Sequence, residues 1–210
     1  MHDTALAGSL RPNPWPWMLL GGVVFAWGAG VLALATAGGF QQDPGQLPLR
    51  LMAGLAVPVL VGVLLWRLVP AIRAWTESWD LAVIVGLQTF RVLGILFLFF
   101  WWVGTLPGLF AWVGALGDIA VGILAIPTML AVARRNAGWQ GRVRWLTVAG
   151  LADFAAVLGV GILSQAGGLL HVPGGADTAV VQTMPLIMIP AFLVPMFILM
   201  LLLQWQRVRG

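Results

Sequence analysis

The chain has 210 residues, of which 60% are hydrophobic and only 9% are charged. A soluble domain has roughly a quarter of its residues charged, so this composition excludes a soluble globular protein and indicates an integral membrane protein. The formal net charge is +4, and cysteine is absent. The lack of cysteine excludes disulfide bonds, thiolate metal sites and cysteine nucleophiles.

Six apolar blocks are long enough to cross a bilayer, because a helix needs about 20 apolar residues to span the hydrocarbon core. In chain order they cover about residues 15–38, 48–69, 79–103, 109–133, 143–165 and 180–203. Polar or turn-forming segments, such as 39–45 and 134–136, separate the blocks. We therefore predict an all-α transmembrane protein, a six-helix bundle that forms a single domain over residues 15–205.

The arginines predict the orientation of this bundle. With six spans, the N-terminus, the loops after the second and fourth spans and the C-terminus lie on one side of the membrane. That side holds Arg11, Arg67, Arg73, Arg134, Arg135, Arg142, Arg144, Arg207 and Arg209. The other side holds Arg50. By the positive-inside rule, the N-terminal segment 1–14 and the tail 206–210 are both predicted to be cytoplasmic. Because the arginines gather at span ends, the net charge does not indicate nucleic-acid binding.

Three charged residues lie deep inside apolar blocks, namely Arg91, Asp118 and Asp153. At ~1.5 Å per residue, Arg91 lies about 18 Å from the cytoplasmic end of the third span. Asp153 lies about 15 Å from the cytoplasmic end of the fifth span, and Asp118 about 14 Å from the outer end of the fourth. All three are thus predicted near the bilayer midplane. A charge in lipid costs roughly 3 kcal/mol on insertion scales, so these side chains must pair, or bind water or a ligand.

The planar guanidinium of Arg91 presents several donors, which suits it to bridge both carboxylates if their helices adjoin. Asp118 shares its helical face with Gly114 and Gly122, and such small-residue faces normally contact other helices. Gln88 lies one turn before Arg91 and is predicted to join the same polar cluster. The predicted site consists of Gln88, Arg91, Asp118 and Asp153.

Two interpretations of this site remain open. In the first, the three charges form a static polar clasp that fixes the register of the helices. In the second, they line a cavity and bind an ion, a proton or a polar head group, as ionisable residues inside membranes often do. One arginine with two aspartates leaves one formal negative charge, which a single bound proton would cancel.

Prolines and aromatic residues mark two of the blocks. Pro185, Pro190 and Pro195 all fall in the sixth span, where each removes a helical donor and is expected to produce a kink. The end of the third span carries Phe97, Phe99, Phe100, Trp101 and Trp102. Such a cluster could pack against a flat ligand, but aromatic residues at span ends more often face lipid or the interface, and we favour that interpretation.

No motif in the chain points to an enzyme. It contains no P-loop, no dinucleotide fingerprint, no Gly-x-Ser-x-Gly elbow and no His-Glu-x-x-His sequence. The two histidines, His2 and His171, both lie outside the apolar blocks, which argues against a haem or an intramembrane metal held by histidine. We therefore predict no catalytic residues, no metal site and no cofactor.

Two parts of the sequence resemble a known group of proteins. The first consists of Leu87–Gly94 followed by Gly117–Gly122, and the second is Pro185–Pro195. Together they resemble an uncharacterised family of small bacterial polytopic integral membrane proteins with no assigned activity. The resemblance covers the third to sixth spans. It implies a location in the bacterial plasma (inner) membrane and carries no catalytic or binding role.

These observations favour a small permease-like protein, or one that binds a ligand or a proton, with a buried Arg-Asp-Asp site. The alternative is a non-catalytic accessory or scaffold subunit of a larger membrane protein complex. The expected partners are the lipid bilayer and either a small polar or amphipathic ligand or other membrane subunits, without nucleic acid.

Overall fold

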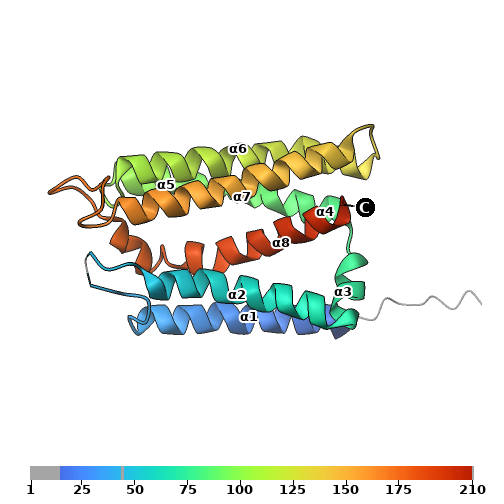
Figure 1. Cartoon of the computed structure of the whole chain (residues 1–210), viewed down its shortest axis with the longest axis horizontal. Helices are drawn as coiled ribbons and strands as arrows, with labels where there is room; N and C mark the ends of the chain where they lie inside the picture. The colour runs from blue at the N-terminus through green and yellow to red at the C-terminus, as the bar shows by residue number, and fades with distance from the viewer. Residues whose placement is uncertain (1–14, 44, 210) are drawn as a thin grey trace, which may run out of the picture.

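The computed structural model describes residues 15–43 and 45–209, which form an elongated bundle of helices (Figure 1). Six helices in this part of the chain are long and apolar enough to cross a membrane. They are α1 (Trp15–Thr36), α2 (Leu49–Leu68), Leu81–Trp102, α6 (Gly108–Ala133), α7 (Trp139–Leu163) and Ile189–Arg207. The predicted all-α transmembrane fold is therefore confirmed. The expected cytoplasmic segment 1–14, with Arg11, lies outside the described residues.

The third and sixth spans are each built from more than one kind of helix. The third consists of α4 (Leu81–Leu87), the 3₁₀ helix η1 (Gln88–Gly94) and α5 (Ile95–Trp102). The sixth consists of the π-helical turn η3 (Ile189–Leu193) and α8 (Val194–Arg207). Two shorter elements lie outside the spans, α3 (Pro70–Glu77) and the 3₁₀ helix η2 (Thr178–Gln182).

The two ends of the bundle differ in their loops and in their charge (Figure 1). One end, which we call the arginine end, holds α3, the turn between α6 and α7, and the end of α8. It carries Arg67, Arg73, Arg134, Arg135, Arg142, Arg144, Arg207 and Arg209. The opposite end, which we call the loop end, holds segments 37–43, 45–48, 103–107 and 164–188 together with Arg50.

Helix α6 lies at the centre of the larger half of the bundle. It packs against α4, η1 and α5 on one side and against α7 on another. Its buried positions include Ala111, Gly114, Ala115, Gly122 and Ala125. Small side chains let neighbouring helices approach closely, and close van der Waals packing holds helices together in lipid. Helix α8 contacts α7, α4 and α2, and thereby joins this half to the α1–α2 hairpin.

The apolar core is divided along α6 into two clusters. The arginine-end core consists of Leu81, Ala82, Val85, Val121, Ala125, Val132, Val143, Leu146 and Val208. The loop-end core consists of Phe97, Leu106, Phe110, Ala111, Ala115, Val181 and Leu186. Asp118 lies on α6 between the residues that belong to these two cores. The charged residues therefore occupy the level of the bundle where the apolar packing is interrupted.

The sixth span begins later than the sequence predicted. We expected it to start at about residue 180, but the helix that can cross a membrane is Ile189–Arg207. Before it, η2 is followed by turns over residues 183–187. Val181, Leu186 and Ile187 are buried in these segments. The apolar run was thus a sign of burial within the protein and not of a helix.

The expected kink at Pro185 is corrected by the same observation. Pro185 lies in the turn before the helix, and Pro190 lies in the π-helical turn η3. Pro195 follows just after that turn, at the point where the span changes from π-helical to α-helical winding. Pro185 therefore precedes the last helix, whereas Pro190 and Pro195 lie in its first two turns, where the winding is irregular.

Candidate functional site

Arg91 reaches the interior from the 3₁₀ helix in the middle of the third span. In a 3₁₀ helix, residues three apart lie directly above one another. Gln88, Arg91 and Gly94 therefore form one row along η1, and all three are buried. The side chain of Arg91 is 0% exposed. The tight winding of η1 thus places one charged and one polar side chain in the same inward-facing row.

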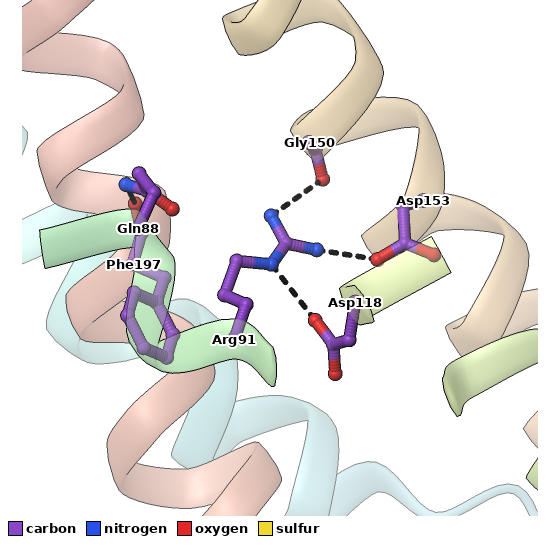
Figure 2. A network of polar contacts seen from close by, with 6 residues as sticks. All are labelled: Gln88, Arg91, Asp118, Gly150, Asp153 and Phe197. Atoms are coloured by element: carbon purple, nitrogen blue, oxygen red, sulfur yellow. Dashed lines mark hydrogen bonds and ion pairs between the residues drawn. The ribbon is translucent and has the colours of Figure 1, made fainter. Parts of the chain in front are cut away.

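Arg91 meets both of the aspartates that the sequence paired with it (Figure 2). Its Nε donates a hydrogen bond to Asp118 Oδ1 at 2.8 Å, and its Nη2 donates to Asp153 Oδ2. Its Nη1 donates to the carbonyl oxygen of Gly150 at 3.4 Å. The guanidinium also lies over the ring of Phe154, 3.8 Å from the ring centroid, which is cation–π geometry. One arginine therefore connects η1, α6 and α7.

Glycines provide the space that this cluster needs. A Cβ added at Gly94 would collide with Asp118, and one added at Gly117 would collide with the carboxylate of Asp153. A Cβ at Gly150 would lie 2.8 Å from Nη1 of the arginine. Each charged side chain thus lies against a glycine of a neighbouring helix, and any larger residue there would displace it.

The small-residue face predicted around Asp118 does contact other helices. A Cβ added at Gly122 would lie 2.8 Å from the backbone nitrogen of Val92, and one at Gly114 would lie 3.3 Å from the ring of Phe97. Both neighbours belong to the third span. This close approach of η1 to α6 brings the start of the Arg91 side chain within reach of the carboxylates.

Gln88 was predicted to join the polar cluster, but its side-chain hydrogen bond goes elsewhere. Its Nε2 donates to the backbone carbonyl of Phe197 on α8, at 3.4 Å (Figure 2). Its Oε1 is buried and has no hydrogen-bond partner among the described residues. The side chain shares a row with Arg91, but its amide is directed to a different helix. Gln88 therefore connects η1 to α8, whereas Arg91 connects η1 to α6 and α7.

The charges of the cluster do not cancel. Arg91 faces two carboxylates, so the formal charge is −1 when both are ionised. Each carboxylate uses one oxygen for Arg91, and within the described residues no hydrogen bond is recorded for Asp118 Oδ2 or Asp153 Oδ1. The Asp118 side chain is 15% exposed and that of Asp153 is 8% exposed. These two free oxygens are the positions at which a proton or a small cation could bind.

Several contacts of the site were missed by sequence reasoning. Phe154 directly follows Asp153, and Gly117 directly precedes Asp118, but neither position was assigned a role. Gly94 lies three residues after Arg91, a spacing that a 3₁₀ helix turns into direct alignment. The spacing of these residues is visible in the sequence, but their contacts in the site depend on which helices are neighbours.

A family model described as "Domain of unknown function (DUF8737)" matches residues 22–208. The chain belongs to this family. The matched part of this DUF8737 protein contains all the charged residues of the site, and the predicted resemblance to an uncharacterised family is confirmed. Searches of curated proteins and of solved structures found no match.

Proposed function

We propose that the protein is a small permease-like membrane protein whose Arg91–Asp118–Asp153 cluster binds a proton. The observation that carries the proposal is the unequal charge of the cluster, in which one buried guanidinium faces two carboxylates. An uncompensated charge inside a membrane is costly, so binding one proton brings the cluster to neutrality. Each carboxylate has an oxygen that Arg91 does not use.

The contacts of Arg91 suggest how a proton would act on the helices. The guanidinium holds α6 through Asp118 and α7 through Asp153 and the Gly150 carbonyl. Protonation of either carboxylate replaces a hydrogen bond between two opposite charges with a weaker one from the guanidinium to a neutral acid. A proton on Asp153 would loosen α7, and a proton on Asp118 would loosen α6. Protonation is thereby linked to helix packing, which is the coupling that a proton-driven permease needs.

Infrared difference spectroscopy on the purified protein tests this proposal. Spectra recorded in mildly acidic minus alkaline buffer, where exposed carboxylates stay ionised in both, should contain a band from a protonated carboxyl group. Asp118→Asn or Asp153→Asn should remove that band, because the single remaining carboxylate and Arg91 already form a neutral pair that needs no proton. The matched control is Asp80→Asn, since Asp80 caps α4 by accepting from Ala82 N, and asparagine also caps helices. A band that survives in both site variants would refute proton binding.

A second candidate function has its own supporting observation. All three nitrogens of Arg91 donate to protein acceptors, and glycines close around the cluster. Such packing also suits a static clasp in an accessory or scaffold subunit of a larger membrane complex. In that case Asp118→Asn and Asp153→Asn would lower the melting temperature or disrupt assembly, while no carboxyl band would titrate in the unsubstituted protein. Measuring thermal unfolding and infrared spectra on the same variants separates the two functions.

The location that we propose is the plasma (inner) membrane of a bacterium, with residues 15–205 as a single domain. Eight of the described arginines lie at the arginine end and only Arg50 lies at the loop end, so by the positive-inside rule the arginine end faces the cytoplasm. Both termini would then be cytoplasmic.

A further inference from the structure

A pocket of about 300 Å³ opens at the loop end of the bundle, away from the charged cluster. It lies between the turn after α5, the start of α6 and the loop that follows α7. Its lining includes Trp101, Gly108, Leu109, Ser164 and Ala176, and none of the described residues that line it is charged. The volume is at the lower end of the range for small-molecule sites. What distinguishes the pocket is the set of hydrogen-bond donors on its wall.

The first donors belong to the N-terminus of α6. Pro107 occupies the N-cap position, where it provides no side-chain cap, and the first turn contains no acidic residue. The backbone N–H groups of Gly108, Leu109 and Phe110 have no recorded acceptor among the described residues, whereas Ala111 N donates to Pro107 O. Free N–H groups and the helix dipole together favour an anion at this end of a helix.

Ser164, which also lines the pocket, provides an independent observation. This residue ends α7 and is 1% exposed, and its hydroxyl is buried without a hydrogen-bond partner. The backbone N–H of Ser164 donates to Val160 O at 2.9 Å, but the hydroxyl makes no such bond. Buried hydroxyl groups are normally paired, so an unpaired one in a pocket wall indicates a partner that is not part of the chain.

Trp101 adds a third kind of donor. A Cβ placed on Gly108 would lie 3.0 Å from the indole Nε1 of Trp101, so the indole nitrogen borders the space that this glycine leaves open. An indole N–H can only donate a hydrogen bond. The pocket therefore combines backbone, hydroxyl and indole donors with no acidic side chain to compete for them.

We propose that this pocket binds the oxyanion of an amphipathic molecule, a carboxylate or a phosphate ester. The oxyanion would accept hydrogen bonds from the start of α6 and from Ser164. The apolar part of the molecule would pack on Leu106, Leu109, Leu170 and Val172, which also line the pocket. On α6, Phe110, Ala111 and Ala115 of the loop-end core come between the pocket residue Gly108 and Asp118 of the charged cluster, and the pocket lining includes no residue of that cluster, so this site does not depend on the proposed proton site.

The absence of cysteine from the chain makes a direct test possible. In Ala176→Cys, a single thiol reports on access to the pocket through its rate of reaction with a water-soluble thiol reagent. Saturating decanoate in maltoside detergent should slow labelling about tenfold, because only unliganded protein reacts. Decanol, which has the same chain without the charge, should not. Leu47→Cys, exposed at the same end but outside the pocket, is the control, and its labelling should not respond to decanoate.

Two changes in the Ala176→Cys background locate the effect. Ser164→Ala removes the hydroxyl, and Gly108→Leu fills the space beside Trp101, so each should abolish most of the protection by decanoate. The two substitutions lie on different elements, at the end of α7 and at the start of α6. If both abolish the protection, misfolding of one variant cannot explain the result. Protection by decanol equal to that by decanoate, or protection that survives both changes, would overturn the proposal.

Labelling in a lipid bilayer shows whether the oxyanion belongs to a phospholipid or to a free carboxylate. If a phospholipid head group occupies the pocket, labelling of Ala176→Cys will already be slow in phosphatidylglycerol nanodiscs, and Ser164→Ala will restore it. If a free carboxylate is the ligand, labelling in nanodiscs will stay fast until decanoate is added. Labelling that neither phosphatidylglycerol nor decanoate slows would show that the pocket binds no oxyanion.

Discussion

Arg91 owes its position to the partners of its three nitrogen atoms, which all lie on α6 or α7. Its side chain is fully buried, so its hydrogen bonds to these protein acceptors replace those that it would make to water. Removing one member of a buried ion pair leaves its partners charged and unpaired. This destabilises the fold more than replacing the whole group with apolar residues would. The energetic role of Arg91 is therefore to make two buried carboxylates tolerable.

Arg91→Met should destabilise the folded protein by about 3–5 kcal/mol, the usual cost of leaving a buried charge without its partner. Unfolding by a denaturing detergent, followed by circular dichroism, would measure the change. Arg73→Met is the matched control, because Arg73 pairs with Glu77 on the exposed helix α3. Loss of such an exposed pair should change stability by less than about 1 kcal/mol.

Replacing all three charges tests whether the cost comes from the orphaned carboxylates. The triple variant Arg91→Met, Asp118→Asn, Asp153→Asn should be more stable than Arg91→Met alone, because no unpaired charge remains buried. The comparison uses the same unfolding assay. A triple variant that is less stable than the single one would mean that the carboxylates have other stabilising partners.

Gly117→Ala should disturb the site without changing any charge. The added methyl group would collide with the carboxylate of Asp153, so we expect a loss of about 1–3 kcal/mol from overpacking. Gly159→Ala on α7 is the control, since a Cβ there meets nothing within 4 Å. Alanine is the better helix former, so that variant should gain up to about 1 kcal/mol. Equal effects of the two substitutions would contradict the tight fit at Gly117.

The residues of the charged cluster could be found from the sequence, but their surroundings could not. Helical rise alone placed Arg91, Asp118 and Asp153 at a similar depth, and the cost of isolated charge required them to meet. The partner of Gln88 depends on which helix lies beside it, and depth along a span gives no information about that. The roles of Gly94 and Gly117 were hidden for the same reason.

At the scale of elements, the 3₁₀ helix η1 is the departure from regular structure that matters most for the site. It lies between α4 and α5 within one span and packs closely on α6. Hydrogen bonds in a 3₁₀ helix have poorer geometry than those in an α-helix, and such a segment inside a span often marks a hinge. The segment that carries Arg91 is thus also the part of its span with the weakest backbone bonds.

Hydrogen exchange should reveal this difference. Backbone amides of residues 88–94 should exchange severalfold faster than those of α6 at the same depth, residues 114–122, because weaker bonds open more often. Mass spectrometry on the protein in detergent can compare peptides that cover the two segments. Both segments lie in the middle of spans and both combine buried with exposed side chains, so unequal access of solvent is not the source of the contrast. Equal protection of both would show that η1 is as rigid as α6.

Hydropathy located most of the spans but not the start of the sixth. Five of the six spans were located within a few residues, because each lies between polar turns. The start of the sixth was wrong because Val181 and Ile187 are apolar yet belong to a 3₁₀ helix and a turn packed inside the protein. Within a membrane, non-helical backbone is tolerated where the protein itself covers it. A segment packed inside the protein in this way carries apolar side chains, so its hydropathy resembles that of a spanning helix.

At the scale of the whole molecule, the chain divides into a well-packed half and a peripheral hairpin. The region of α4–α8 contains both cores on α6, whereas α1 and α2 attach through a separate cluster that includes Val31, Leu51 and Ala191. Most of the surface of α1 and α2 is apolar and exposed in the isolated chain, as expected for helices that face lipid. The charged cluster is thus placed in the half of the molecule with the most helix-to-helix contact.

The orientation of the molecule in the membrane gives the last prediction. The arginine end carries eight of the described arginines and the loop end only Arg50, so the arginine end should face the cytoplasm. Ala137→Cys places a thiol in the exposed turn between α6 and α7, and Leu47→Cys places one in the loop before α2. In intact cells, a membrane-impermeant thiol reagent should label Leu47→Cys and leave Ala137→Cys unmodified until the membrane is opened with detergent. The reverse pattern would place the arginines outside and would mean that the charge asymmetry serves binding and not topology. Because the chain has no native cysteine, each variant carries one thiol only, and any labelling of the protein reports on that position.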